Sequence, residues 1–526
     1  MTDVLERPRS HSITLPTPAP PDDNRSHRAT WLALGIITVV GTLLRLRGLT
    51  TGGLWRDDAW VAMSSRVGLG TAWHMWLTAP GFFFIERTWI ALHLNSTVWD
   101  QMPPLFMGIA AMPAAFALTR YFRFPRWLCL GAALTICVSP TCMIYSTRIK
   151  EYGGDFLLAC LILGLGEAAR RNPGRRELVR LGLITVCSFA ISASTLPVIL
   201  GVWFVVAATA LRDPQSRRRC LMVAGPAVVA CLGIAAIFDS HLSPVIRRDF
   251  VGNYFNLSSP HAFVSGACAF ISSLYVRMIG LGDGKQWGPP LLFVVVSALI
   301  ILGLRSRRDM LAPALVMGAA LVACALGEVP LGTGRTDVVL YPALLLLIAS
   351  GIASVHQWLA SRITSSSTRR MTFGGTAAVM VAALLIGGIG VANAYPATDT
   401  RALAAVVSHQ MKPGDHIVVD ELMRYPWAYY EDTPLHLAFS SKYAAGFTVI
   451  STQPRVFIAP SEYYEGGSDP KAWARGFSSY SRLWFVETPP LSLSPLYKAL
   501  LADGWHPLRT IQANGCAAIL LERSPG

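Results

Sequence analysis

The sequence predicts an α-helical polytopic membrane protein that ends in a small α/β domain. The chain of 526 residues is 52% hydrophobic and only 14% charged, well below the roughly 25% charge of soluble domains. Its apolar residues gather in runs long enough to cross a bilayer, and its arginines gather between those runs. Beyond residue 395 the apolar runs shorten to the length of strands.

The first 28 residues contain Pro, Ser, Thr and charged residues and no long apolar run. They predict a disordered cytoplasmic tail and not a cleavable signal peptide, so the first span is the targeting signal. We therefore expect three parts. They are the tail at 1–28, a transmembrane domain at 29–394 and an extracytoplasmic α/β domain at 395–526.

About eleven transmembrane helices are predicted in the second part. The predicted spans are Trp31–Gly48, Pro103–Tyr121, Trp127–Tyr145, Gly153–Ala169, Leu178–Thr195, Pro197–Leu211, Cys220–Phe238, Pro289–Leu304, Leu311–Gly327, Val338–Gln357 and Phe373–Asn393. If the N-terminus is cytoplasmic, every cytoplasmic loop is rich in arginine, as the positive-inside rule requires. These loops account for the net charge of +14, so we expect no nucleic-acid partner.

The apolar segment His261–Leu281 is not counted as a span, because a twelfth span would place Arg305 and Arg307 outside. We expect it to form a re-entrant or interfacial helix on the outer side. With an odd number of spans, the first loop, the Arg148–Tyr152 stretch and the Glu328–Asp337 loop share the extracytoplasmic face with the C-terminal domain. Because these segments share one face of the membrane, their polar residues are able to form one site.

The region from Tyr395 onward alternates short apolar runs with helical patterns, as an α/β domain does. The expected strands are His416–Asp420, Arg455–Ala459, Arg482–Val486 and Ala517–Leu521, and the expected helices are Arg401–Met411 and Pro495–Asp503. Nine of the ten cysteines fall in or beside apolar segments, and only Cys516 lies in this domain. Neither a disulfide framework nor a C-x-x-C metal site is predicted.

Two adjacent carboxylates, Asp57 and Asp58, follow the first span. The flanking Trp55 and Trp60 are typical of a loop at the membrane interface. A carboxylate partly shielded from water there is suited to act as a general base toward an incoming hydroxyl. The alternative is a solvated loop in which an aspartate caps a helix, and the pair alone leaves both open.

A second polar cluster runs from Tyr145 to Asp155. Arg148 and Lys150 are suited to grip a phosphate, and Lys150 is the only lysine in the first 284 residues. Asp155 lies just inside a span, where an unpaired charge is costly, so it needs a polar partner. The alternative is an interfacial snorkelling pair, with Asp155 capping a helix.

A third cluster, Gly327–Asp337, is rich in Gly and Pro and is followed by Tyr341. Its glycines allow the backbone to approach a ligand closely, and Arg335 is again a phosphate-type donor. The alternative is a tight external turn with an exposed arginine.

In their order and common membrane side, these elements resemble the GT-C class of membrane glycosyltransferases. The particular resemblance is to the family 39-like group of protein mannosyltransferases and lipid A aminoarabinose transferases. It covers roughly residues 31–395 and rests on three motifs: Asp57-Asp58, the Tyr145-Ser146…Lys150-x-Tyr152 stretch with Asp155, and Gly332-x-x-Arg335 with Tyr341-Pro342. The family commonly has Asp-Glu in the first loop, so Asp58 stands where the glutamate would be.

The resemblance implies transfer of a hexosyl or pentosyl group from a polyprenyl-phosphate donor to a hydroxyl of a glycan, lipid or protein acceptor, on the extracytoplasmic side. It assigns Asp57 as the general base of an inverting single displacement, with Asp58 beside it in the catalytic pair. The remaining residues that it implies are Arg148, Lys150 and Arg335 at the donor phosphate and Tyr152, Asp155 and Tyr341 in support. We expect no cofactor and no metal, although a divalent cation at the acid pair stays open, because two carboxylates alone argue weakly for one.

Two other classes of protein remain. A transporter or lipid-linked sugar flippase would also have many spans, but transporters tend to show repeated halves and helices broken near the midplane. Here the polar clusters lie at helix ends on one face, and no repeat is visible. A non-catalytic scaffold that presents the C-terminal domain predicts that replacing Asp57 is silent.

Overall fold

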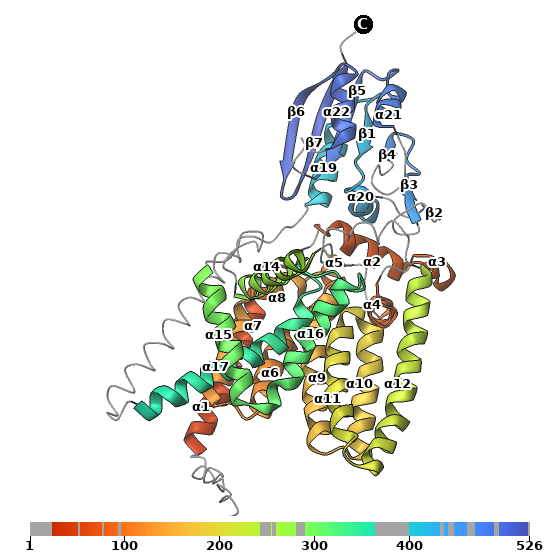
Figure 1. Cartoon of the computed structure of the whole chain (residues 1–526). Coiled ribbons are helices and arrows are strands. Elements are labelled where there is room, and N and C mark those ends of the chain that lie inside the picture. The colour runs from red at the N-terminus through yellow and green to blue at the C-terminus, as the bar shows by residue number, and fades with distance from the viewer. Residues whose placement is uncertain are drawn as a thin grey trace, which may run out of the picture.

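The structure, a computed structural model, consists of a helical bundle with a sheet domain over one of its ends (Figure 1). This confirms the predicted fold class, while the count of eleven spans and the domain boundaries stay predictions. The structure describes residues 24–50, 53–75, 78–92, 96–241, 254, 259–279, 290–362, 399–431, 436–439, 447–459, 469–488 and 494–523. The last predicted span, Phe373–Asn393, lies outside the described residues.

The bundle helices coincide with the first ten predicted spans. They are α1 (Asn24–Leu46), α6 (Met102–Tyr121), α7 (Arg126–Val138), α8 (Pro140–Tyr145), α9 (Tyr152–Arg171), α10 (Arg175–Ile191), α11 (Leu196–Ala210), α12 (Pro214–His241), α15 (Pro290–Ser306), α16 (Leu311–Ala325) and α17 (Tyr341–Arg362). In the described part of the chain, seven helices are long and apolar enough to cross a membrane. The chain is therefore a multi-pass membrane protein, and α1 begins inside the predicted tail.

One predicted span is broken in the structure. The segment Trp127–Tyr145 forms two helices, because α7 ends at Val138 and α8 begins at Pro140. Ser139 between them has an extended backbone, with φ −63° and ψ 118°. A residue that precedes proline is sterically pushed out of the α region, so the Ser139-Pro140 pair sets the break.

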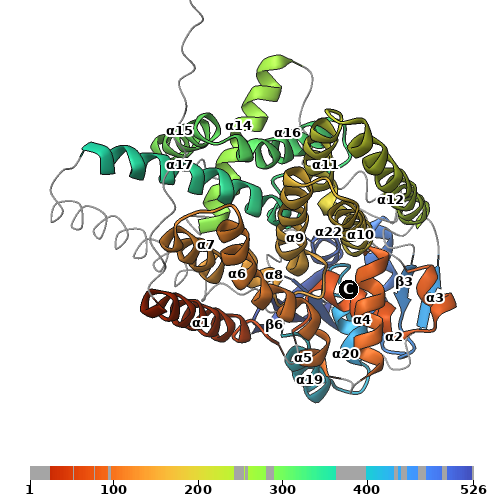
Figure 2. The ribbon, with the colours of Figure 1, turned by 90° about the horizontal axis from the view of Figure 1, so that it is seen from below.

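Helices outside the predicted spans cover the end of the bundle that faces the sheet domain. They are α2 (Arg56–Arg66), α3 (Leu69–Trp73), α4 (Pro80–Ala91), α5 (Thr97–Asp100) and α14 (Pro260–Ile279). Figures 1 and 2 show that α14 lies across this end of the bundle, where an interfacial helix was expected for His261–Leu281. We call this end the domain end and the opposite one the far end.

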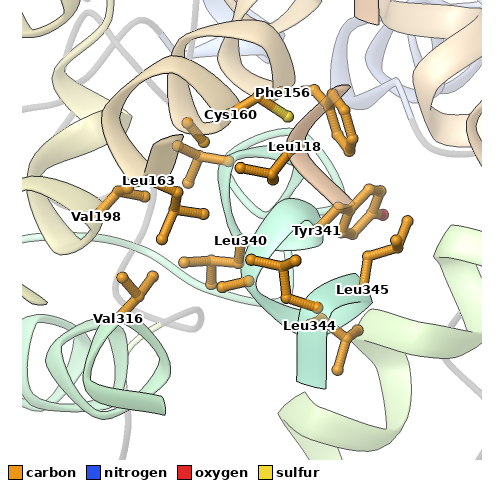
Figure 3. Close-up of a cluster of buried hydrophobic side chains, with 14 of the residues drawn as sticks. Leu118, Phe156, Cys160, Leu163, Val198, Val316, Leu340, Tyr341, Leu344 and Leu345 are labelled. Atoms are coloured by element: carbon orange, nitrogen blue, oxygen red, sulfur yellow. The ribbon is translucent and has the colours of Figure 1, made fainter. Parts of the chain in front are cut away.

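The bundle core is a continuous cluster of buried apolar side chains. Figure 3 shows part of this cluster, with Leu163 of α9, Val198 of α11 and Leu344 of α17 among its side chains. Close helix contacts depend on small residues, as is usual in membranes. A Cβ at Gly351 of α17 would lie 2.2 Å from the carbonyl oxygen of Leu299 in α15, so only glycine fits there.

The C-terminal domain contains a five-stranded sheet in the order β4-β1-β5-β7-β6, with β1 parallel to β4 and β5 and with β7 antiparallel to β5 and β6. Its strands are β1 (His416–Val419), β4 (Val456–Ile458), β5 (Arg482–Glu487), β6 (Trp505–Ala513) and β7 (Cys516–Arg523), and a separate hairpin pairs β2 (His436–Phe439) with β3 (Phe447–Ile450). Its helices are α19 (Thr400–Gln410), α20 (Arg424–Glu431), α21 (Pro470–Gly476) and α22 (Pro495–Ala502).

The strands β1, β5 and β7 of this sheet are mostly buried, with helices on both faces. Along β5, Trp484 belongs to the cluster that includes Leu403 of α19, whereas Phe485 belongs to the cluster that includes Leu500 of α22. This alternation is the period-two pattern of a strand. Because side chains on both faces are covered, the four predicted strands were recognisable as apolar runs.

The domain rests on α2 through aromatic side chains. The ring of Trp60 in α2 stacks on that of Tyr425 in α20 at 5.6 Å and meets Phe447 of β3 edge-on. The backbone N–H of Leu54 donates to the hydroxyl of Tyr430 at 3.2 Å. Because α2 carries the acid pair, these contacts place the C-terminal domain next to it.

Candidate active site

The acid pair lies in the first turn of α2, where a negative side chain faces the positive end of the helix dipole. Asp57 and Asp58 are both buried, with 7% and 2% of their surface exposed. Neither of them caps the helix, because the N-cap residue is Trp55 and makes no side-chain cap hydrogen bond. The pair is therefore not the solvated helix cap that the sequence left open.

Asp57 is held by positive charges from three segments. Its Oδ1 accepts a hydrogen bond from Arg56 Nε at 3.2 Å, and its Oδ2 accepts one from Arg335 Nη1 at 3.0 Å. Burial by itself raises the pKa of Asp57, but the charges of Arg56, Lys150 and Arg335 outweigh it and hold the pKa below its usual range. Asp57 is therefore ionised and able to accept a proton.

Asp58 has different partners and the opposite shift. Its Oδ2 accepts a hydrogen bond from Arg148 Nη1 at 2.8 Å, and its Oδ1 accepts one from the backbone N–H of Ile149 at 3.1 Å. Burial raises the pKa of Asp58 above its usual range in spite of Arg148, and the charge of Asp57 adds to the rise. The pKa values of the two carboxyls are thus shifted in opposite directions, and such a difference lets neighbouring acids take different roles.

The segment between α8 and α9 brings two cations to α2. Lys150 Nζ lies 5.4 Å from the ring centre of Trp60, and the guanidinium of Arg148 lies 5.2 Å from that of Trp55. These are cation–π distances. The two tryptophans that flank the acid pair therefore also hold the predicted phosphate-binding side chains.

Close packing against α6 and α1 fixes this segment. A Cβ at Gly108 of α6 would lie 2.0 Å from Ser146 Oγ, so a larger residue would displace the segment. Arg45 of α1 is fully buried. Its Nε donates to Ser146 Oγ at 3.0 Å, and its Nη groups donate to the carbonyls of Ile136 and Cys137 at 2.9 and 3.2 Å. Arg45 thus ties the end of α7 to the segment that carries Arg148.

The Gly-rich loop is folded around Asp337. Gly332 and Gly334 have φ angles of +78° and +81°, which favour glycine, and their N–H groups donate to the Asp337 carboxylate at 2.9 and 2.8 Å. Arg277 of α14 donates to the carbonyl of Gly332 at 2.7 Å. This folding presents Arg335 to Asp57, with 25% of its side chain exposed, so the alternative of an exposed arginine on an external turn does not hold.

Tyr152 and Asp155 lie one turn apart at the start of α9. The ring of Tyr152 meets that of Tyr145 edge-on at 5.6 Å, and Tyr152 lies near Arg335 and Asp57. Asp155 is fully buried and faces Ser192, which follows α10. The structure therefore brings Tyr152 to the acid pair and places Asp155 deeper in the bundle.

Tyr341 lies apart from the acid pair. It is fully buried at the start of α17, and Figure 3 shows its ring next to Phe156 and Leu345 in the bundle core. Its charged neighbours are Asp337 and Arg277. Its place in the structure is therefore beneath the Gly-rich loop.

Sequence reasoning missed an ion-pair network at the edge of the site. Arg66 Nη2 donates to Asp100 Oδ2 at 2.7 Å and to the hydroxyl of Tyr429 at 2.6 Å, and that hydroxyl donates to Asp100 Oδ2 at 2.7 Å. The three residues join α2, α5 and α20. They are too far apart in sequence for any motif to connect them.

Glu86 of α4 was missed as well. It is fully buried, and its carboxyl oxygens have no hydrogen-bond partner within the described residues. Burial raises the pKa of Glu86 well above its usual range, and the charges of Asp100 and Asp58 add to the rise. The residues next to Glu86 in the sequence are rich in Phe, and they do not predict that a neutral carboxyl lies beside the acid pair.

The surroundings of the acid pair suit an anion better than a metal ion. Arg56, Arg148, Lys150 and Arg335 already supply more positive charge than the two carboxylates balance, and a divalent cation would add to that excess. No group of three or more His, Cys, Asp or Glu side chains suited to a metal occurs in the described part of the chain.

The bundle, the transverse helices and the sheet domain above them together have a GT-C-like fold. The structure is similar to that of ArnT from Cupriavidus metallidurans, a GT-C lipid A aminoarabinose transferase, in its apo state. The TM-score is 0.54 at 12% sequence identity, over 94% of this chain and 98% of that chain. Identity this low shows the fold alone.

A second structure of ArnT, bound to undecaprenyl phosphate, gives a TM-score of 0.49 at 14% identity, with the same coverage of both chains. No family model matches the sequence, and no curated protein matches it.

Proposed function

We propose that this protein transfers a hexosyl or pentosyl group from a polyprenyl-phosphate donor to the hydroxyl of a glycan, lipid or protein acceptor. One observation carries the proposal. A buried, ionised aspartate, Asp57, meets Arg335 and the charge of Lys150, and its neighbour Asp58 pairs with Arg148, so cations from two distant segments surround the acid pair. The GT-C fold supports it.

The cations are placed to meet the donor. A lipid-linked donor lies in the bilayer with its phosphate at the level of the headgroups, and these side chains lie at the domain end of the helices. Arginine and lysine bind phosphate oxygens through charge-assisted hydrogen bonds. We assign Arg148, Lys150 and Arg335 to the donor phosphate and Tyr152 to its support.

The reaction is a single displacement. Asp57 takes the proton of the acceptor hydroxyl, and the hydroxyl oxygen forms a bond to the anomeric carbon. The bond from that carbon to the phosphate oxygen breaks, and polyprenyl phosphate leaves as an anion that the cations stabilise. The configuration at the anomeric carbon inverts.

Donor binding also activates the base. Arg335 contacts Asp57 at 3.0 Å and lowers its pKa, so in the free protein Asp57 is a weak base. When Arg335 turns to the donor phosphate, Asp57 loses that charge and its pKa rises. Proton transfer is thereby favoured when the donor is in place.

The orientation of the protein in the membrane follows from the positions of its arginines. The far end of the bundle carries Arg120, Arg170, Arg171 and Arg307, near the ends of α6, α9 and α15. The positive-inside rule places that end in the cytoplasm, together with the N-terminus. The C-terminal domain and the acid pair are then extracytoplasmic.

The test is sugar transfer from a labelled polyprenyl-phosphate donor by the purified protein in lipid, with release of free polyprenyl phosphate as the readout. Asp57→Asn keeps the shape of the side chain and removes the base, so we expect a loss of about 10²- to 10⁴-fold with donor binding retained. Glu328→Gln, at an exposed carboxyl near the Gly-rich loop, is the matched control. Equal rates for Asp57→Asn and wild type, or no consumption of any donor, would overturn the proposal and favour a transporter.

A further inference from the structure

A cavity opens at the far end of the bundle, away from the acid pair. It has a volume of about 490 Å³, and its lining includes His27, Trp31, Phe116, Arg120, Tyr121 and Arg126. These residues come from the start of α1, the end of α6 and the start of α7. Figure 2 shows the three helices side by side at this end. The volume falls within the range of small-molecule sites.

The chain turns sharply beneath this cavity. Arg123, between α6 and α7, has a φ of +60°, and Phe122 and Phe124 on either side of it are fully buried. The turn is closed by hydrogen bonds from the N–H of Arg123 to the carbonyl of Arg120 and from that of Phe124 to Thr119. This turn brings Arg120 and Arg126 to the same cavity from two different helices.

The cavity is positively charged. Among the described residues, its lining contains two guanidinium groups and no acidic side chain. The first turn of α7, with its N–H groups at the positive end of the helix dipole, adds to the field at Arg126.

The cavity also lies at the level of the lipid headgroups. The spans of α1 and α6 are each 20 residues long and begin or end at His27 and Tyr121, and 20 helical residues match the hydrocarbon thickness. Trp31 and Tyr121 are exposed at the cavity, as aromatic residues are at membrane interfaces. Trp31 Nε1 donates to His27 Nδ1 at 3.1 Å, which orients the indole.

We propose that this cavity binds the phosphate headgroup of an anionic phospholipid, with Arg120 and Arg126 on the phosphate and Trp31, Phe116 and Tyr121 against the glycerol and the upper acyl chains. The bilayer is the source of the ligand, because only 17% of the α1 span is buried inside the protein, so one wall of the cavity faces lipid. Basic pockets between helices are known to hold anionic headgroups in this way. The site is separate from the donor site at the domain end.

The test is retention of phosphatidylglycerol by the purified full-length protein, measured by native mass spectrometry in mixtures with phosphatidylcholine. We expect the double variant Arg120→Gln, Arg126→Gln to retain phosphatidylglycerol about 10- to 30-fold less than wild type, with phosphatidylcholine unchanged. The control is Arg217→Gln, Arg218→Gln, which removes the same charge from exposed positions on α12 at the same end. It should behave as wild type.

Two outcomes overturn the proposal. One is equal retention by the cavity variant and the control, and the other is displacement of the bound lipid by millimolar glycerol phosphate, which would point to a soluble phosphate ligand. The single variant Arg120→Gln, at an exposed side chain, keeps the test valid if the double variant fails to fold. Sugar transfer in phosphatidylcholine is expected to be unchanged in these variants, because the cavity lies away from the acid pair.

Discussion

Two buried pairs of carboxyls in this protein have opposite surroundings. Asp57 and Asp58 in α2 are each bonded to an arginine from a distant segment. Asp420, which follows β1, and Glu487, at the end of β5, lie in the C-terminal domain and are equally buried. Among the described salt bridges, none involves this second pair. Ser494 Oγ donates to Asp420 Oδ1 at 3.1 Å.

The difference shows in the protonation of the two pairs. Cations hold the pKa of Asp57 below its usual range against the effect of burial. In the C-terminal domain burial raises the pKa of Glu487 to about 8, with Asp420 adding to the rise, and it raises that of Asp420 to about 6, with Glu421 adding to it. The comparison teaches that burial alone makes a carboxyl a weak acid, and that the cations around α2 are what keep a base ionised there.

The largest effect is expected when an acid of the first pair is made to resemble the second. Arg148→Met leaves Asp58 buried without its guanidinium partner, and breaking a buried pair in this way costs about 3–5 kcal/mol. Thermal unfolding in detergent measures the loss, with Arg217→Met on exposed α12 as control. Adding Asp58→Asn should restore part of the stability, because position 58 then no longer holds a buried carboxylate without a partner. Equal melting temperatures for Arg148→Met and the control would refute the pairing.

The next effect is on the rate. Arg335→Met removes a cation from the donor phosphate and from Asp57, and we expect sugar transfer to fall by about 10²- to 10³-fold. Because the Asp57 pKa rises when the charge is lost, the acidic limb of the kcat/KM profile should also move to higher pH. Arg308→Met, at an exposed residue of the far end, is the control. If the variant is slower but its acidic limb does not move, Arg335 does not set the pKa of the catalytic base.

The order of the helices and the position of the first pair could be predicted from the sequence, because apolar runs and arginine-rich loops are local signals. Hydropathy located α1 and α17, and the adjacent acids between two tryptophans marked α2. The strand β6 escaped prediction, since its residues are mostly exposed and form no apolar run. The break at Ser139 was also missed, although the proline after it was a local signal.

The contacts within the site could not be predicted. Asp57 and Arg335 are 278 residues apart, and Asp58 and Arg148 are 90 apart. No periodicity reaches over such distances, so the sequence suggested that they meet only through the common membrane side of their loops and the resemblance of the motifs. The Arg66–Asp100–Tyr429 network and the buried Glu86 belong to no motif, and only packing of the loops against the C-terminal domain reveals them.

The second pair predicts a pH dependence opposite to that of Asp57. Glu487 ionises near pH 4.3 when unfolded and at about 8 when folded, so the folded state holds its proton longer. The contribution of Glu487 to the stability of the C-terminal domain should therefore be full below pH 4.3 and be lost as pH rises to about 8. Hydrogen exchange of the β1 and β5 amides, corrected for intrinsic rates, measures this fall. Glu487→Gln should flatten it, and an equally steep fall in the variant would contradict the assignment.

The smallest effect is expected at an acid with surroundings between these two extremes. Asp100 has one cation, Arg66, and one hydroxyl, that of Tyr429, and burial still raises its pKa above the usual range. Tyr429→Phe removes the hydroxyl and keeps the ring over Arg66, so we expect a loss of about 1 kcal/mol in unfolding free energy and little change in sugar transfer. Tyr480→Phe in the C-terminal domain is the matched control. A loss of transfer as large as that of Arg335→Met would instead make this network part of the acceptor site. Asp100 would then be a third catalytic carboxyl beside Asp57 and Asp58.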